Sequence, residues 1–461
     1  MQQALILLRE GLRGSTRDFT EGHVGQAVIV LAIPMVLEMC MESLFAVVDV
    51  FFVSRLGADA VAAVGLTESL LSIVYSVAIA LCIGATAVVS RRFGEKDFEG
   101  AAVAAVQVIV VGVLVSAAIG VLGGMNARAL LRIMGASETV LAGPATFGVV
   151  MLSGCGSVVL LFLMNAIFRA AGDASVAMRV LWFANAINLV LDPLFIFGIG
   201  PFPELGVVGA SVATTTGRSA AVLVQLFLLC SGYGRIRVQS RHLRIVPRVM
   251  WTVCRLSATG LLQILISTTS YIGLVRVISM FGSPAVAGYT IGLRTVLFAL
   301  LPSWGLSNAA ATMVGQALGA GKPDRAEAAV WTACRYNLVF LGSIGFLFVA
   351  FAPWIVGIYT SDPAVAGYAV GCLRIVSLGF VFYAFGMVLT QSFNGAGDTW
   401  TPTYLNLFVF WIFEIPLAYT LAYYFGWGPD GVFWAITLAF SLLAIASGIM
   451  FRRGKWKLKV V

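Results

Sequence analysis

The chain has 461 residues, of which 60% are hydrophobic and only 11% are charged, and its mean hydropathy is +0.97. This composition excludes an ordinary water-soluble globular protein and indicates a membrane protein. The net charge of +8 does not require a nucleic-acid partner, because the cations gather in the short polar segments that separate the apolar runs.

Apolar runs long enough to cross a bilayer recur along the whole chain. A transmembrane helix needs about 20 such residues, and about twelve runs meet this requirement. The predicted spans lie near 27–54, 61–90, 101–123, 139–171, 176–198, 205–231, 251–280, 286–316, 326–350, 362–394, 402–425 and 430–451. We therefore predict an all-α polytopic membrane protein with about 12 transmembrane helices.

The first span carries three acidic residues on one face. Glu38, Glu42 and Asp49 are spaced by four and seven residues, which places them on one side of a helix. Pro34 precedes them and removes a backbone hydrogen bond, so we expect the helix to bend there. Ionisable groups inside spans are costly and usually face a cavity. Asp49 is thus a candidate functional group, whereas Glu38 and Glu42 are either substrate contacts or hydrated residues near the end of the span.

The fifth span, NLVLDPLFIFG, places a carboxylate inside an apolar run. Asn188 and Asp192 are one helical turn apart, and Pro193 frees a backbone carbonyl beside them. In the sixth span, GVVGASVATTT, Thr214 follows small residues at which two helices can approach closely. These oxygen atoms suit a hard monovalent cation or a shared proton. The alternative is a hydrogen-bond network between helices without a transport role.

The two halves of the chain repeat each other at one spacing. GADAVA at 57–62 matches GSPAVA at 282–287, and Asp173 matches Asp398, both at an offset of 225 residues. Each half then holds six spans, and the two six-helix lobes are parallel repeats related by a pseudo-twofold axis. The predicted domains are an N-lobe at 1–231, a cytoplasmic linker at 232–250 and a C-lobe at 251–461. This organisation is typical of secondary transporters.

The distribution of charge predicts the orientation in the membrane. Most Lys and Arg residues lie in segments on one side, so the positive-inside rule places both termini in the cytoplasm and the chain in the cell membrane. Seven Cys are scattered singly through the apolar runs and both His lie in polar segments, which indicates neither disulfides nor a zinc site. We expect no cofactor besides a coupling ion, no nucleic-acid partner, and a functional monomer that contacts membrane lipid and small organic substrates.

Taken together, these segments resemble the multidrug and toxic compound extrusion (MATE) family. VVDVFFVSRLGADAVAAVGL, with Pro34 fifteen residues before Asp49, is similar to the first-helix signature of that family, and the NLVLDPLFIFG and GVVGASVATTT segments to its fifth- and sixth-helix pattern. NAIFRAAGD and SFNGAGDTWTP are similar to the ends of its fourth and tenth helices, and MVGQALGAGKP is similar to the loop after its eighth helix. The resemblance implies a V-shaped pair of lobes that exports organic, often cationic compounds in exchange for Na⁺ or H⁺. It also implies a cation site formed by Asp49, Asn188, Asp192 and Thr214, as in the archaeal and DinF-like branches.

The chain departs from one branch of this family in the seventh helix. That branch carries a Glu there, whereas this chain offers only Gln263 and hydroxyl groups, so we expect the coupling site in the N-lobe. Glu414 stands in the eleventh span, roughly where Asp192 stands in the other repeat. It is a second ion site, a substrate contact or a buried structural group. Gln263 and Glu414 join Glu38 and Glu42 as candidate residues of a substrate cleft.

The function predicted from these features is secondary active antiport for multidrug efflux by alternating access, and not catalysis. If Asp49 and Asp192 are adjacent, they cannot both stay ionised without a cation, so the coupling ion and the substrate would compete for them. One alternative is a flippase for a lipid or lipid-linked substrate. Another is an intramembrane aspartyl protease, suggested by GAGD at 395–398, although Asp398 has the position of a loop residue and helix N-cap.

Overall fold

The computed structural model describes residues 2–15 and 17–460, and the side chains of all of these except residues 2–4, 46–50, 54 and 58. Every regular element in that part of the chain is a helix. Within it, ten helices are long and apolar enough to cross a membrane, and the number rises to twelve if each of two bent helix pairs is one span. The prediction of an all-α polytopic membrane protein is confirmed.

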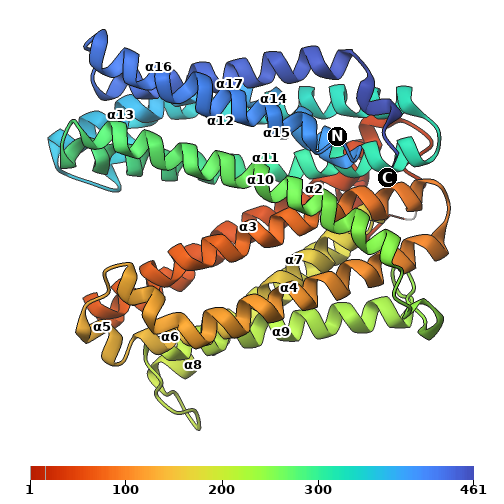
Figure 1. Ribbon diagram of the computed structural model, residues 1–461, viewed down its shortest axis with the longest axis horizontal. Helices are drawn as coiled ribbons and strands as arrows, with labels where there is room; N and C mark the ends of the chain where they lie inside the picture. The colour runs from red at the N-terminus through yellow and green to blue at the C-terminus, as the bar shows by residue number, and fades with distance from the viewer. Residues whose placement is uncertain (1, 16, 461) are drawn as a thin grey trace. The chain divides into compact units, whose positions relative to one another are not determined.

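The helices follow the predicted spans closely (Figure 1). The elements of the first half of the chain are α1 (Gln2–Arg13), α2 (Val24–Val53), η1 (Ser54–Leu56), α3 (Ala58–Gly94), α4 (Phe98–Ile133), α5 (Glu138–Ala142), α6 (Ala145–Ser153), α7 (Cys155–Ala170), α8 (Ala174–Phe197), α9 (Val207–Ser231) and η2 (Ser240–His242). Those of the second half are α10 (Pro247–Ser279), α11 (Ser283–Gly319), α12 (Pro323–Gly357), α13 (Pro363–Leu378), α14 (Phe380–Gly395), α15 (Trp400–Asn406), η3 (Leu407–Glu414), α16 (Ile415–Tyr419), η4 (Thr420–Tyr424), α17 (Pro429–Arg452) and η5 (Lys455–Leu458).

The secondary structure repeats at the spacing found in the sequence. Helices α3 and α11 each have 37 residues, and they begin at Ala58 and Ser283, 225 positions apart. The two bent spans show the same offset, because α6 and α7 meet at Gly154 with a bend of 44° and α13 and α14 meet at Gly379 with a bend of 59°. The sequence predicted single spans at these places. A side chain at Gly154 would collide with Thr215, which explains why the residue at the bend is small.

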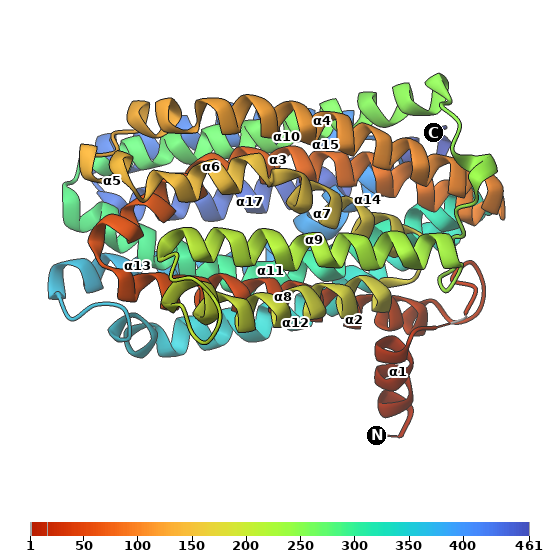
Figure 2. The ribbon, with the colours of Figure 1, turned by 90° about the horizontal axis from the view of Figure 1, so that it is seen from below.

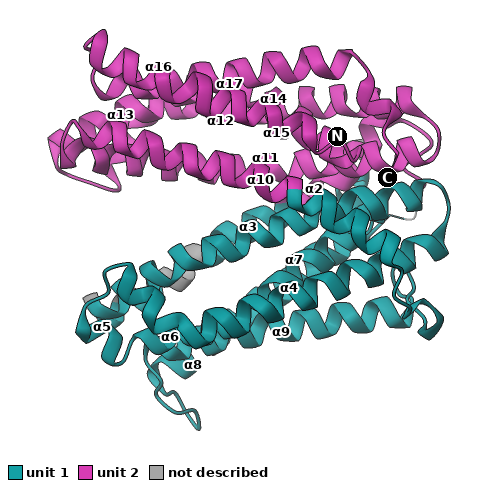
Figure 3. Cartoon of the chain, viewed as in Figure 1, with its two compact units in different colours: residues 1–16, 37–258 teal, residues 17–36, 259–461 magenta. Residues whose placement is uncertain are grey.

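The chain divides into two compact units, shown in Figure 3. Unit 1 consists of residues 1–16 and 37–258, and unit 2 consists of residues 17–36 and 259–461. The chain therefore changes unit three times, between residues 16 and 17, inside α2 and inside α10. The predicted lobe boundaries concern the internal repeat, which packing units do not test, so they stay a prediction.

Unit 1 is built from long helices that pack side by side. Helix α8 lies along α9, α3 packs against α7, and α4 packs against both α3 and α6. Figure 2 shows α1 running across the direction of α8, which it contacts near one end. Small residues bring the helices close: a Cβ atom at Gly209 in α9 would lie 2.5 Å from the carbonyl carbon of Phe195 in α8.

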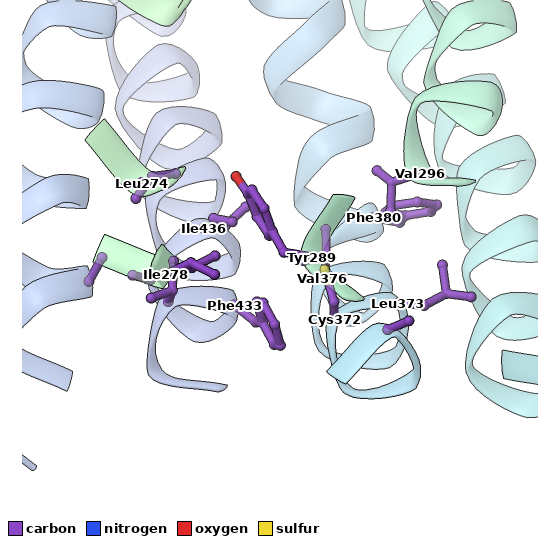
Figure 4. Packing of buried hydrophobic residues seen from close by; sticks show 14 of the residues in the cluster. Leu274, Ile278, Tyr289, Val296, Cys372, Leu373, Val376, Phe380, Phe433 and Ile436 are labelled. Carbon is purple, nitrogen blue, oxygen red and sulfur yellow. The ribbon is translucent and has the colours of Figure 1, made fainter. Parts of the chain in front are cut away.

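Unit 2 has its own apolar core, part of which is shown in Figure 4. The ring of Tyr289 from α11 lies nearly parallel to that of Phe433 from α17, with 6.2 Å between their centroids. Val376 and Phe380, on either side of the bend at Gly379, belong to the same cluster. Residues from α10, α11, α12, α13, α14, α16 and α17 thus share one buried cluster, which fixes the path of the bent span.

Candidate functional site

Three of the predicted coupling residues form one hydrogen-bonded group in unit 1. The Asn188 amide nitrogen donates to Asp192 Oδ1 at 3.2 Å and to Thr214 Oγ1 at 3.0 Å. The side chains come from α8 and α9, and they meet because these helices approach at glycines. A Cβ atom at Gly217, one turn after Thr214, would lie 2.8 Å from the Ala184 carbonyl oxygen.

The group is closed to solvent. Asp192 is fully buried, Asn188 is 2% exposed and Thr214 is 6% exposed. Among the described residues, no hydrogen-bond donor lies within reach of Asn188 Oδ1. Carboxylate, amide and hydroxyl oxygens therefore converge in an apolar helix pair, and such oxygens are ligands for a hard cation or acceptors for a proton.

The remaining predicted member of the group lies in the first span. Asp49 is a residue of α2, but its side chain lies outside the described residues. The proximity of its carboxylate to that of Asp192 therefore stays a prediction. Helix α2 continues through Pro34 as one element, and Pro34 belongs to unit 2 whereas Asp192 belongs to unit 1.

Glu38 forms a buried ion pair that the sequence analysis did not anticipate. Its Oε1 atom lies 2.6 Å from Arg169 Nη1 and accepts a hydrogen bond of 3.0 Å from the Asn165 amide. The Asn165 oxygen in turn accepts from Gln225 at 2.6 Å. Since Glu38 is 1% exposed, its charge is neutralised inside unit 1 by a resident cation. The structure places it away from bulk water, not in the hydrated position that the sequence left open.

Glu42 lies one turn further along α2, beside a second arginine. Its Oε1 atom is 3.5 Å from Arg218 Nη2, and Arg218 also donates to the Tyr75 hydroxyl at 2.9 Å. The Arg218 guanidinium lies 5.3 Å from the centre of the Phe45 ring. Arg218 is only 5% exposed. The acidic face of α2 thus contacts two buried arginines in unit 1.

The two candidate residues of unit 2 form hydrogen bonds, and Glu414 has no ion-pair partner in the described part of the chain. Gln263 Oε1 accepts from the Asn394 amide at 3.2 Å. Glu414, which is 3% exposed, ends the π-helical segment η3 and accepts from the Ser270 hydroxyl at 2.9 Å. The sulfur, oxygen and nitrogen ligands of a transition-metal site are not gathered in either unit, because no cluster of three His, Cys, Asp or Glu side chains occurs among the described residues.

Gln263 and Asn394 are the repeat counterparts of Glu38 and Arg169. Each stands 225 positions after its counterpart, which is the offset of the internal repeat. A neutral hydrogen bond in unit 2 therefore occupies the place of a charged pair in unit 1. This substitution is visible in the sequence once the offset is applied, but only the contacts show that the residues are paired.

Arg169 and Arg218 are the site residues that reasoning from the sequence missed. The sequence pattern assigns Arg169 to a cytoplasmic segment, because it lies near the end of an apolar run, and it gives Arg218 no role. The available signal was the rule that buried charges occur in pairs. Applied to the acidic face of α2, it requires partners, and these two arginines are the ones that the fold supplies.

Comparisons with known proteins match almost the whole chain. The sequence model of one family, MatE, matches residues 34–194 and again residues 260–420. A probable multidrug resistance protein NorM from Thermotoga maritima is 24% identical over 95% of this chain and 94% of its own length. An FAD transporter from Shewanella oneidensis is 25% identical over 93% of this chain and 95% of its own length.

Solved structures give the same result. The outward-facing conformation of a multidrug resistance MATE family transporter of the MOP superfamily superimposes with a TM-score of 0.88 at 25% identity, over 98% of this chain and 99% of the other. A MOP superfamily transporter from Pyrococcus furiosus, described as having a binding pocket of reverse polarity, superimposes with a TM-score of 0.89 at 25% identity, over 96% and 98% of the two chains.

Proposed function

Because this chain belongs to the MatE family of multi-pass membrane transporters, we propose that it is a secondary active antiporter that exports organic cations or amphiphiles in exchange for H⁺ or Na⁺ by alternating access. Proteins of this family are transporters and not enzymes, which excludes an intramembrane protease. Relatives are described as multidrug resistance or export proteins, and this supports a range of organic substrates. The motifs of the first, fifth and sixth helices favour the DinF-like branch.

One observation supports the proposal most directly: Asn188, Asp192 and Thr214 share hydrogen bonds in a buried position. A fully buried carboxylate is costly when ionised unless a cation or a donor faces it. Asn188 already donates one hydrogen bond to Asp192, and binding of a proton or of Na⁺ to this group would lower the remaining cost. Ion binding to this group can therefore change the packing of α8 against α9, which would couple an ion gradient to a change in structure.

Coupling follows if ion and substrate cannot be bound favourably at the same time. We place Asp49 in the same site, as its position on α2 suggests, so that two carboxylates share one small cation. Neutralising them weakens the attraction for a cationic substrate, and release of the ion restores it. The bend that we expect at Pro34 would connect this change to α2. Both termini lie in the cytoplasm in this proposal, and the monomer is the functional form.

The experiment is export of a fluorescent organic cation from membrane vesicles under an imposed Na⁺ or pH gradient. We expect Asp49→Asn and Asp192→Asn each to lower gradient-driven export by about tenfold or more, because each removes an ionisable oxygen of the coupling site. Asp97→Asn is the matched control, since Asp97 belongs to unit 1 but its side chain is 43% exposed at the start of α4. Full gradient-driven export in both site variants would show that the carboxylates are structural.

An organic anion is the second candidate substrate, and Arg218 is the observation that favours it. This buried guanidinium lies among Glu42, Tyr75 and Phe45, where an arginine and aromatic rings can bind an acidic, planar molecule. The FAD transporter relative supports the same class of substrate. Export of FAD from the same vesicles, lost in Arg218→Gln, would identify the anion as the substrate, whereas export of the cation alone would exclude it.

A further inference from the structure

Unit 2 has an apolar groove that ends at a basic residue. Side chains from α12, α14 and α17 line it and enclose about 300 Å³. Phe382, Ile445 and Ile449 form part of its walls and are 41%, 52% and 54% exposed, respectively. All three helices belong to candidate membrane spans. Arg452, the last residue of α17, is the charged group in its lining.

The guanidinium of Arg452 is held at the end of this groove. It lies 5.7 Å from the centre of the Trp331 ring, at a distance typical of a cation–π contact. Trp331 packs edge-on against Phe451, with 5.8 Å between the ring centres. Phe451 is 1% exposed. Arg452 is therefore stacked on an aromatic ring that the protein core holds in place.

The basic segment that follows is folded against the unit. Gly454 has a φ of 70°, a left-handed conformation that turns the chain back at the end of α17. Trp456 is then 1% exposed, stacks on Phe451 with 4.5 Å between ring centres, and donates to the Phe451 carbonyl at 2.9 Å. The segment thus presents its cations from fixed positions.

Only some of these cations form ion pairs that hold the C-terminal segment against the rest of unit 2. Lys457 pairs with Glu327 at 2.6 Å, and Lys459 pairs with Asp398 at 3.2 Å. Among the described residues, no carboxylate forms an ion pair with Arg452, Arg453 or Lys455. Three exposed cations therefore remain at the end of an apolar groove, without an acidic partner from the described part of the protein.

From this arrangement we propose that unit 2 binds an anionic phospholipid of the surrounding membrane. One acyl chain lies in the groove between α12 and α17, and the phosphate contacts Arg452, with Arg453 and Lys455 near it. Basic pockets between transmembrane helices bind anionic headgroups in this way, and an arginine can contact two phosphate oxygens at once. Charge complementarity selects this lipid over a zwitterionic one, whose headgroup carries no net charge.

A second hollow in unit 2 has no cation in its lining and can be compared with the groove that ends at Arg452. Leu338, Gly342, Phe346 and other residues of α12 line this open hollow, and no charged residue belongs to its lining. Any lipid chain can lie there, because the contact is apolar. This hollow is the internal control for the proposal.

The test uses the purified full-length protein in micelles that contain equal amounts of phosphatidylglycerol and phosphatidylcholine, with native mass spectrometry to count the lipids retained. We expect the wild type to retain phosphatidylglycerol preferentially and Arg452→Gln to lower that preference about fivefold, the effect of one basic residue near a charged headgroup. Arg452→Lys keeps the charge and should keep most of the preference. Equal preference in Arg452→Gln and wild type would overturn the proposal.

The groove is tested separately from the charge. A Cβ atom at Gly448 would meet only Leu389, at 3.9 Å, so Gly448→Leu fills the groove without a backbone clash. We expect it to reduce retention of phosphatidylglycerol, whereas Gly342→Leu, which fills the uncharged hollow, leaves the preference intact. The same loss in both variants would contradict the proposed site. If Gly448→Leu does not fold, the lipid preference of Arg452→Gln still tests the proposal.

Discussion

Single residues in unit 1 show how the fold accommodates charge at membrane depth. Glu38 and Arg169 lie 2.6 Å apart, and both are nearly fully buried. At the corresponding positions of the other repeat, Gln263 and Asn394 form a neutral hydrogen bond. A charged pair in one repeat and a neutral pair in the other therefore occupy equivalent positions. Removing one partner of the charged pair, by contrast, leaves an uncompensated buried charge.

This comparison predicts the effect of exchanging one pair for the other. Glu38→Gln and Arg169→Asn should each lower the free energy of unfolding by about 3–5 kcal/mol, because each leaves a single buried charge. The double variant recreates the Gln–Asn pair of unit 2 and should recover at least half of that loss. Titration with a denaturing detergent measures all three. A double variant whose loss equals the sum of the single losses would show that the pair is not a unit.

Glycines set the spacing between helices at the candidate site. Helix α9 approaches α8 so closely at Gly209 that a Cβ atom would lie 2.5 Å from the carbonyl carbon of Phe195. The hydrogen bond from Asn188 to Thr214 bridges the same two helices. The coupling group therefore depends on the packing of α8 against α9 as well as on its own side chains.

We therefore predict that Gly209→Ala lowers the free energy of unfolding by about 1–3 kcal/mol, the usual effect of overpacking, and weakens ion-driven export. The control is Gly342→Ala in α12, where a Cβ atom would meet nothing within 4 Å. Because alanine favours a helix over glycine, this control should be neutral or slightly stabilising. Thermal unfolding of both variants checks the prediction, and equal destabilisation would contradict it.

The loop between α7 and α8 gives a pH dependence that can be measured. Burial raises the pKa of Asp173, an effect only partly offset by the backbone N–H of Arg235, which donates to Asp173 at 2.5 Å, and by the charge of that arginine. A carboxyl group with a raised pKa binds its proton more tightly in the native state than in the unfolded chain. Its stabilising contribution is complete below about pH 4 and is lost as the pH rises through the native pKa.

The wild type should therefore lose thermal stability relative to Asp173→Asn as the pH is raised from about 4 to 7. Arg235→Gln removes an opposing charge and should make this loss steeper. Melting temperatures of the three proteins across that range provide the test. A wild-type curve parallel to that of Asp173→Asn would mean that Asp173 does not contribute to the pH dependence.

For the whole molecule, an even number of spans would have a direct consequence. Two bent pairs, counted as one span each, bring the number of candidate spans among the described residues to twelve. With this number of spans we expect both termini on one side of the membrane, and the positive-inside rule predicts that this is the cytoplasmic side. Epitope tags at the two ends, digested by protease in sealed vesicles of known orientation, should be cleaved together when the cytoplasmic side faces outward. Cleavage of one tag alone would require an odd number of spans.

The fold class and three members of the candidate site were predictable because they depend on local patterns. Apolar runs of sufficient length become spans whatever their neighbours, and the one-turn spacing of Asn188 and Asp192 places both on one helix face. The sequence predicted that Asn188 and Thr214 share a site, but not the hydrogen bond between them. That bond forms because small residues in α9 allow the two helices to approach closely.

The spans and the repeat follow from the sequence alone, since hydrophobic length and a 225-residue offset can be read along the chain. Which charges meet depends on the tertiary packing, which places Arg169 against Glu38 and Arg218 beside Glu42. The physical reason is distance along the chain. Partners more than a hundred residues apart in unit 1 are brought together by helix packing, and local sequence carries no record of that packing.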